Sequence, residues 1–549
     1  MSAPYPHLAH RAEWERPSAP VGRARERLLV GLGALIPLAL ALAISIEMPK
    51  PSVGQAVVMI GITLGVAAVV ALVLSTRYAV TLTLLVLYLG LLEGPIKLEH
   101  PSRFSSGIRD VLILAIVIGM LARLTLKRER VTLPPLSAWP LAFVAVVVVE
   151  ALNPDTHGAL KVIGGYRQLL EFVPLFFFGY LIMRSKRRFR QLFLLFGVIA
   201  LANGVVGAYQ SRLSPAQLAS WGSGYGAHVH GNGHGLSGRT YVVEGVGHPR
   251  APALGSDSGF GGGAGLLALP GLLALLAAGR MRRRWPAVLC CLGALLGIAS
   301  SASRQSTVIL VVSVLVFALL WVIAGLGARR AIAWVATVAI LTTGVVSVLV
   351  AVNGSAVIAR QAKLLNPRVK QGAGLEVEEE ELSTDGKLNG LSKLPPTLTR
   401  APFGLGLGRG ASASGFGGRE KLTIEEERIT AASAYNLLAV EAGAPGLLLW
   451  IGFALSVIAL GVSRLRRVAD RELRIYLVAI LTTFIAFTIQ GFSGPTLAVT
   501  PAGAYLWFAP GVLAYWLAGE GFAAVQAGLS SRTVRRSSGM AGATAGSVT

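Results

Sequence analysis

Apolar runs of about 15 to 25 residues recur along this 549-residue chain, from Leu28 almost to its end. A helix needs about 20 consecutive apolar residues to span the hydrocarbon core of a bilayer. Only 14% of the residues are charged, against about 25% in soluble proteins. Cys290 and Cys291 are the only cysteines, which excludes a disulfide framework. A soluble enzyme, a secreted disulfide scaffold and a disordered chain are therefore excluded, and we expect an all-α, polytopic membrane protein.

The runs predict about 14 transmembrane helices. They cover residues 28–46, 53–75, 78–92, 107–126, 136–152, 168–183, 191–209, 258–279, 287–299, 307–327, 331–352, 433–460, 475–491 and 501–517. The chain then divides into a cytoplasmic tail (1–27), a seven-helix region (28–209), an outer loop (210–257), a four-helix region (258–353), a large outer loop (354–432), a three-helix region (433–518) and a second cytoplasmic tail (519–549).

The distribution of Lys and Arg predicts the orientation. With the N-terminus in the cytoplasm, the short inside segments carry most of the cations and the short outside segments carry few, as the positive-inside rule requires. Both termini are then cytoplasmic. The net charge of +23 is explained by segments that face anionic lipid, so no nucleic-acid partner is needed.

Two features of the second half face outward in this orientation. We interpret residues 286–326 as a helical hairpin whose tip, Ser300–Ser306, places Arg304 at the outer membrane surface. The two long loops also lie outside, and loops of this length are usually functional or disordered. The glutamate run at residues 376–381 is expected to be solvated, since like charges at this density repel.

Four arginines on the outer face are the strongest candidates for chemistry. They are Arg167, Arg250, Arg304 and Arg409. A guanidinium near the apolar layer is costly unless it is paired, and its planar fork suits phosphate oxygens. The structural alternative is snorkelling to the surface, or an ion pair with Glu171, Glu150 or Asp257.

Two loop motifs invite other interpretations that we do not favour. The string HVHGNGHG contains His228, His230 and His234, but no acidic or cysteine ligand stands at a typical spacing, so we expect a mobile polar loop rather than a metal site. A histidine there would still suit a general base. The string GLGLGRG, which contains Arg409, lacks the GK[ST] ending of a P-loop. Its glycines instead allow tight turns and close approach of the backbone.

The run that begins AYNLLAVEAGAPGLLLW contains polar groups in an apolar helix, Asn436 and Glu441. Gly443, Pro445 and Gly446 follow, and we expect them to bend the helix. Broken helices at membrane depth often line a cavity. This segment is therefore the predicted floor of a site beneath the second outer loop.

The order of these motifs resembles a known family. SASRQS, PFGLGLGRG, AYNLLAVEAGAPGLLLWIGF and PAGAYLWFAPGVLAYW are similar to the C-terminal module of the O-antigen ligase and Wzy-polymerase superfamily, and GGYRQLLEFVPLFFFGYL and HPRAPALGSDSGFGGG extend the resemblance over residues 164–516. It implies a GT-C-like glycosyltransferase of the bacterial cytoplasmic (inner) membrane. Its substrate would be undecaprenyl-diphosphate-linked oligosaccharide at the outer face, with no cofactor and no metal.

The resemblance also implies residue roles. Arg304 and Arg250 would bind the donor diphosphate and stabilise it as a leaving group, and Arg167 and Arg409 are candidates for the same task. Negative charge develops on the diphosphate as the anomeric bond breaks, and preorganised guanidiniums stabilise that charge.

One position departs from the family pattern. Ligases of the family carry a histidine before the asparagine, where this chain has Tyr435 before Asn436. A phenol, with a pKa of about 10, is a poor base at neutral pH. The substitution favours a polymerase over a ligase, keeps Tyr435 and Asn436 as candidate substrate-binding residues, and makes Glu441 the candidate replacement base.

Three other functions stay open. A lipid-linked oligosaccharide flippase also often has fourteen spans, but alternating access favours repeated halves with polar groups at the midplane, which this sequence lacks. A lipid-II-type polymerase has a related architecture, but its outer-loop aspartate motif is not apparent. A scaffold with an inactive site is suggested only by Tyr435. Polysaccharide-export or chain-length-control proteins are possible partners of the favoured polymerase.

Overall fold

The computed structural model describes residues 78–99, 109–110, 112–113, 117, 133–156, 158–230, 240–243, 246–257, 259–279, 284–353, 391–410 and 433–523. The chain forms two compact units, one of residues 1–85 and 102–131, the other of residues 86–101 and 132–549. The fold and the sites described below belong to the second unit. The predicted spans at 28–46 and 53–75, most of 107–126, and the glutamate run lie outside the described residues.

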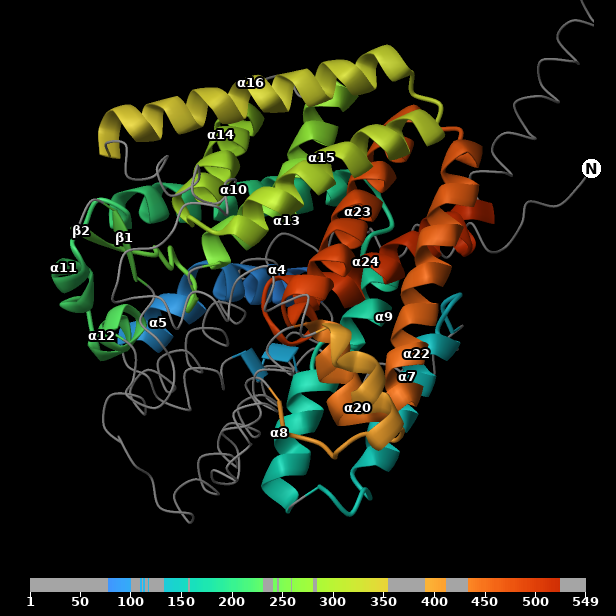
Figure 1. Ribbon diagram of the computed structural model, residues 1–549. Coiled ribbons are helices and arrows are strands. Elements are labelled where there is room, and N and C mark those ends of the chain that lie inside the picture. Colours follow the sequence, from blue (N-terminus) through green and yellow to red (C-terminus); the bar gives the residue numbers. More distant parts are fainter. Residues whose placement is uncertain are drawn as a thin grey trace, which may run out of the picture. The chain divides into compact units, whose positions relative to one another are not determined.

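The described residues are almost entirely helical (Figure 1). The helices are α4 (Tyr78–Leu87), a π-helical turn (Tyr88–Leu92), α5 (Glu93–Glu99), α7 (Ala138–Glu150), α8 (Ala159–Leu170), α9 (Pro174–Ile182), α10 (Lys186–Gln210), α11 (Pro215–Ala219), α12 (Ser223–His230), α13 (Phe260–Ala278), α14 (Trp285–Ser300), α15 (Arg304–Ile323), α16 (Ala328–Asn353), α20 (Leu394–Arg400), α22 (Ala434–Arg464), α23 (Arg471–Gln490) and α24 (Ala502–Leu517). Short 3-10 turns occupy Leu465–Arg467, Gly491–Ser493 and Thr496–Ala498, and β1 (Thr240–Val243) pairs antiparallel with β2 (Val246–Pro249).

Six of the described helices are long and apolar enough to cross a membrane: α10, α13, α15, α16, α22 and α23. Their outer surfaces are apolar as well. On α15 and α16, large side chains such as Val308, Leu315, Ile332 and Ile340 are more than half exposed. Apolar side chains on the outside of a helix bundle are stable in lipid and not in water. The expectation of a helical membrane protein is confirmed.

One end of the second unit collects the arginines next to the helix termini. Arg464 Nη1 donates to the Leu517 carbonyl oxygen at 3.0 Å, and Arg474 Nη1 donates to the Ala324 carbonyl oxygen at 2.9 Å. The start of α23 therefore lies beside the ends of α15, α22 and α24. We call this the basic end, and it comprises residues 184–190, 324–330, 464–474 and 516–522.

The opposite end of the unit collects the termini that adjoin the predicted outer loops. The Ala434 amide donates to the Gly494 carbonyl oxygen at 3.0 Å, which joins the start of α22 to the turn after α23. Gln305 Nε2 donates to the Gln490 carbonyl oxygen at 3.4 Å, which adds the start of α15. We call this the loop end, comprising residues 204–210, 250–263, 300–306, 433–436 and 490–503. The grouping of the two sets of termini agrees with the predicted alternation of helix direction.

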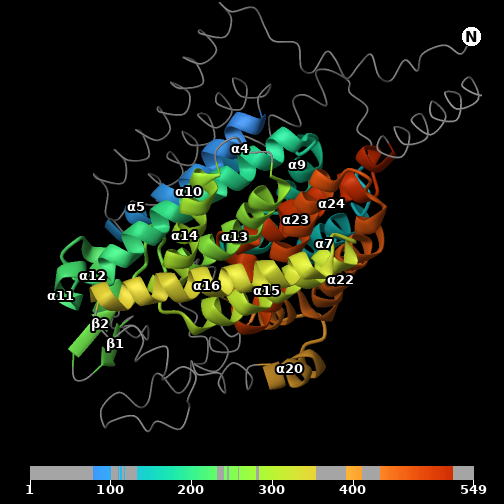
Figure 2. The ribbon, with the colours of Figure 1, turned by 90° about the horizontal axis from the view of Figure 1, so that it is seen from above.

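The predicted hairpin is confirmed. Helix α14 ends at Ser300 and α15 begins at Arg304, so the turn is three residues long. Ala302 adopts the left-handed region (φ 47°) to reverse the chain, and the Ser303 side chain caps α15 by accepting a hydrogen bond from the Ser306 amide at 3.3 Å. Figure 2 shows α16 lying across α14 and α15, against which it packs.

The predicted single span at 168–183 is wrong in one respect, because two helices replace it. Helix α8 ends at Leu170, and α9 starts afresh at Pro174. Proline has no amide hydrogen and its ring clashes with the preceding helical turn, so it is tolerated at the first position of a new helix. The consequence is that α8 is a separate element.

The predicted mobile polar loop at HVHGNGHG is also corrected for its first half. His228 and His230 lie in α12, whose buried face packs with α11 and α5. The packed side chains include Leu98, Leu218 and Tyr225. The apolar positions of α11 and α12 bury a small core of their own, and this core orders the segment. His234 lies outside the described residues.

Candidate functional site

Helix α8 is polar inside and apolar outside. Lys161 and Gln168 are buried, together with the two glycines between them, at positions that share one helix face. Leu160 and Ile163 on the other face are 57% and 54% exposed. A water-soluble helix has the reverse arrangement. The buried face of α8 therefore marks a polar interior, which is where a membrane protein places its functional groups.

Residues 401–410 (APFGLGLGRG) pack as an irregular segment against the connection between α7 and α8. Gly404, Gly406 and Gly408 all have φ between 75° and 93°, a region that L side chains rarely adopt. A Cβ on Gly406 would lie 2.7 Å from Thr156 Oγ1, and one on Gly408 would meet the Lys161 carbonyl group. The predicted role of these glycines in close backbone approach is confirmed.

The same segment enters a break in α22. Gly443 has non-helical angles (φ 60°, ψ −164°), which interrupt the helix at the predicted bend. The Ala444 amide donates to the Pro402 carbonyl oxygen at 2.8 Å, and the Leu405 amide donates to the Val440 carbonyl oxygen at 2.6 Å. Backbone groups that the break leaves without helical partners thus form hydrogen bonds with the irregular segment 402–405, as an apolar environment requires. Figure 1 shows α22 beside α7, with α20 near the same end.

Glu441 lies two residues before this break and is fully buried. Its Oε1 accepts hydrogen bonds from Gln168 Nε2 at 3.1 Å and from the Gly410 amide at 2.8 Å. Lys161, whose Nζ donates to the Gly408 carbonyl oxygen at 3.3 Å, is the cation that interacts with the carboxylate. No group in the described part of the chain donates to Oε2. A buried oxygen of this kind is costly unless a hydrogen-bond donor satisfies it.

A second buried carboxylate, Glu150, is satisfied differently. Its Oε1 accepts from Asn153 Nδ2 at 2.5 Å, and Asn153 also donates to the Gly404 carbonyl oxygen at 3.4 Å. Arg409 Nη2 donates to the Asp155 carbonyl oxygen at 3.1 Å. Glu150 and Arg409 therefore both hold the glycine segment against the α7–α8 connection. Arg409 has a clear structural role, and its predicted part in diphosphate binding stays a prediction.

Arg250 is carried by a tightly held segment at the loop end. His228 Nε2 donates to the Arg250 carbonyl oxygen at 2.9 Å. Ala253, three residues after Arg250, is held by the buried side chain of Gln210. Gln210 Nε2 donates to the Ala253 carbonyl oxygen at 3.1 Å, and Gln210 Oε1 accepts from the Ala253 amide at 2.7 Å. His228 and Gln210 thus fix the backbone on both sides of Pro252.

Helix α13 brings the Arg250 segment and the Arg304 hairpin together. A Cβ on Gly261 would lie 3.1 Å from the Ala253 Cβ, and one on Gly262 would lie 3.0 Å from the Ser301 hydroxyl oxygen. Both segments therefore pack on the first turn of α13. The structure gathers the backbones that carry Arg250 and Arg304, the two residues predicted to bind the donor diphosphate, at one helix terminus.

Tyr435 and Asn436 open α22 at the loop end. The Tyr435 hydroxyl donates to the Thr488 carbonyl oxygen at 2.9 Å, and its ring lies 4.4 Å from that of Phe492 between centroids. The Asn436 amide donates to Ser433 Oγ at 3.0 Å as part of the helix cap. The Tyr435 proton is thus committed to a backbone carbonyl, as expected of a residue that is not a base. Substrate contact by either residue stays a prediction.

The 3-10 turn Thr496–Ala498 connects the Glu441 region with the loop end, since it packs against α8, α22, α23 and α24. Arg167 lies in the last turn of α8, next to Gln168.

Sequence reasoning missed Lys161, Gln168 and Gln210. The spacing 161, 164, 165 and 168 was the available signal, because it places polar and small residues on one helical face.

No known family model matches this chain, and comparisons with curated proteins and with solved structures also found no match. The family resemblance of the motifs therefore stays a prediction. Within the described residues, no group of three or more His, Cys, Asp or Glu could hold a metal ion.

Proposed function

We propose that this chain is a membrane glycosyltransferase that polymerises undecaprenyl-diphosphate-linked oligosaccharide repeats into a cell-surface polysaccharide. The proposal includes a GT-C-like arrangement of about 14 transmembrane helices, both termini in the cytoplasm, and catalysis at the outer face of the bacterial cytoplasmic membrane. The observation that carries it is Glu441, a fully buried carboxylate with one oxygen held in place and the other without a donor in the described residues.

Glycosyl transfer needs a group that accepts a proton. The acceptor hydroxyl loses its proton as its oxygen forms the new bond to the anomeric carbon, and the bond from that carbon to the diphosphate breaks. Glu441 Oε2 is the proton acceptor in this proposal, and the hydrogen bonds to Oε1 orient it. The Tyr435 hydroxyl is less suited, because it already donates to a carbonyl oxygen.

The departing diphosphate gains negative charge and needs cations. Arg250 and Arg304 take this role, since both are carried by segments packed on the first turn of α13. The N-terminal turn of a helix carries partial positive charge, which would add to that of the guanidiniums. Arg167, in the last turn of α8, would extend the site towards Glu441.

The test is reconstitution of the full chain in liposomes with undecaprenyl-diphosphate oligosaccharide from its host, followed by gel electrophoresis. A ladder of lipid-linked products is expected. Glu441→Gln should lower its rate of formation by about 100-fold or more, and Arg304→Ala should abolish it, both without loss of membrane insertion. Arg329→Ala, which changes an exposed arginine at the start of α16, is the matched control and should leave the ladder intact.

Other outcomes would assign other functions. If the donor stays unchanged by itself and reacts only when a separate lipid or protein acceptor is added, the protein is the ligase. Movement of the donor across the bilayer without any glycan product would indicate the flippase. An intact ladder in the Glu441→Gln variant would remove Glu441 from the mechanism.

A further inference from the structure

The basic end carries a surface on which cations outnumber acids by far. Its described cations on α9–α10 and on the α22–α23 connection are Arg184, Lys186, Arg187, Arg188, Arg190, Arg464, Arg466, Arg467, Arg471 and Arg474, and its described acids are Asp470, Glu472 and Glu520. Most of these cations are already engaged within the protein.

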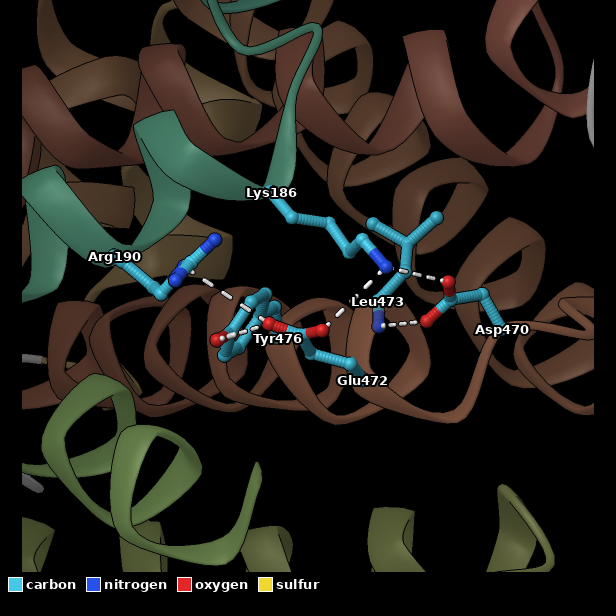
Figure 3. Close-up of polar contacts among 6 residues, drawn as sticks. All are labelled: Lys186, Arg190, Asp470, Glu472, Leu473 and Tyr476. Carbon is cyan, nitrogen blue, oxygen red and sulfur yellow. Dashed lines mark hydrogen bonds and ion pairs between the residues drawn. The ribbon is translucent and has the colours of Figure 1, made fainter. Parts of the chain in front are cut away.

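Two of the three acids are engaged by two cations on α10 (Figure 3), and the third, Glu520, lies 4.0 Å from Arg184 Nη1 through its Oε2. Lys186 Nζ lies 2.7 Å from Asp470 Oδ2 and 3.4 Å from Glu472 Oε2, and Arg190 Nε lies 3.9 Å from Glu472 Oε1. Glu472 is buried and also accepts a hydrogen bond from the Tyr476 hydroxyl at 2.9 Å. These contacts hold the start of α10 against the start of α23, so residues next to Lys186 and Asp470 are brought close together.

Several other arginines at this end are engaged by backbone or aromatic groups. Arg464 donates to the Leu517 carbonyl oxygen, Arg188 Nη1 donates to the Ile182 carbonyl oxygen at 2.7 Å, and the Arg184 guanidinium lies 5.1 Å from the centroid of the Tyr515 ring. Such contacts stabilise the ends of α9, α22 and α24 and orient these guanidiniums towards groups of the protein.

Four arginines remain. Arg187, Arg466, Arg467 and Arg471 are exposed, and none makes a hydrogen bond or ion pair with a described residue. A Cβ on Gly325 would lie 3.7 Å from Arg466 Nε, so Arg466 lies beside the α15–α16 connection and the other three are left. Arg187 follows Lys186 and Arg471 follows Asp470, so the 2.7 Å ion pair between Lys186 and Asp470 places both arginines at the junction of α10 and α23. Arg467 is the last residue of the 3-10 turn that precedes this junction.

We propose that Arg187, Arg467 and Arg471 form a binding site for the phosphate of an anionic phospholipid head group. The site lies at the termini of apolar helices, where head groups meet the protein. Guanidiniums match phosphate oxygens with paired donors. The inference is independent of the proposed function.

The experiment measures lipid binding by the purified full chain in detergent, with native mass spectrometry. Phosphatidylglycerol and phosphatidylcholine of the same acyl chains are the two probes, and the protein is expected to retain the former preferentially. Each substitution of Arg187, Arg467 or Arg471 by Gln should weaken phosphatidylglycerol binding by about fivefold, since each basic residue near an anionic head group contributes about that factor.

Arg329→Gln with Arg330→Gln is the matched control. These arginines are also exposed and lie in the first turn of α16. No ion pair among the described residues brings a second basic segment next to them, as the Lys186–Asp470 pair does for the proposed site. The control should bind phosphatidylglycerol as the wild type does. Equal loss in the control, or equal binding of both lipids by the wild type, would overturn the proposal. The substitutions are made singly, and retention of phosphatidylcholine and of the size-exclusion profile reports that each variant is folded.

Discussion

Gln168 and Glu441 are 273 positions apart in the sequence, and the side-chain amide of the first donates to the carboxylate of the second at 3.1 Å. The contact joins α8 to α22 in the interior of the second unit. It also fixes which oxygen of Glu441 is held, so that the other oxygen is the proton acceptor in the proposed reaction. Gln168 is therefore a positioning residue in the proposed reaction.

Removal of this contact should slow polymerisation. A hydrogen bond to a charged group is worth about 1.5–3 kcal/mol, so Gln168→Leu is expected to lower the turnover rate by roughly 10- to 100-fold. The KM for the lipid-linked donor should change little, since Gln168 acts through Glu441. Steady-state rates in liposomes measure both. Leu160→Ala, on the exposed face of the same helix, is the control and should keep the wild-type rate.

Substitution of Gly443 by Ala should destabilise the protein. The residue has φ 60°, and an added Cβ would meet the backbone of Phe403 and Gly404. Strain of this kind costs about 1–3 kcal/mol, so the thermal midpoint in detergent should fall. Gly344→Ala in α16 is the control, because a Cβ there meets nothing within 4 Å and its φ is ordinary. A control as unstable as Gly443→Ala would contradict the explanation.

Gln210→Leu should also destabilise the protein and impair polymerisation. The Gln210 amide is the hydrogen-bond partner of both the Ala253 amide and the Ala253 carbonyl oxygen. An apolar side chain leaves two buried backbone groups unsatisfied, at a cost of about 1–3 kcal/mol each. Thermal unfolding measures the loss, and Val205→Ala, which alters an exposed residue of the same helix, is expected to have little effect.

The ion pair at the basic end predicts a pH dependence. Partial burial raises the pKa of the Asp470 carboxyl. Hydrogen bonds from Lys186 and from the Leu473 amide lower the pKa by more than burial raises it, so the net pKa lies below the ordinary value of 3.8. A carboxyl with a lowered pKa stabilises the fold above its unfolded-state pKa, and the contribution is lost as the pH falls through the folded-state pKa.

Asp470→Asn isolates this charge, because asparagine also caps helices well. The variant should be less stable than the wild type at pH 7, by at most about 1 kcal/mol since the pair is partly solvated. The difference should shrink as the pH falls below 3.8 and vanish below the folded-state pKa. Urea titrations at pH 7 and at a series of lower pH values would decide it, and a difference that stays constant over the series would show that the charge is not responsible.

The sequence predicted those parts of the fold that have local signals. Gly443 with Pro445 predicted the bend in α22, and the hairpin followed from the positive-inside rule, because a single span there would have placed Arg329 and Arg330 outside. The break before Pro174 was missed because the run around it is uniformly apolar, and hydropathy alone does not report where a helix ends. The ordering of α12 was missed because its few apolar residues pack on distant elements.

The candidate site was predicted less completely. Glu441 stood out because a carboxylate in an apolar run is costly. Its partners did not, since Gln168 and Gly410 reach it only through tertiary packing of segments far apart in the sequence. Hydropathy reports which residues face lipid, whereas the polar face of α8 is directed into the protein. The sequence shows this face only through the spacing of its small and polar residues.

The alternation of glycine and leucine in residues 404–408 has a consequence for how the chain tolerates changes in length. Every second position faces a neighbouring backbone, so deletion of one residue would move a leucine into a place with room for hydrogen only. Many point substitutions at Leu405 or Leu407 preserve this register, but no single-residue insertion or deletion does. We therefore expect natural variants of this chain to differ in loop length outside residues 404–410 and to keep the length of that stretch constant.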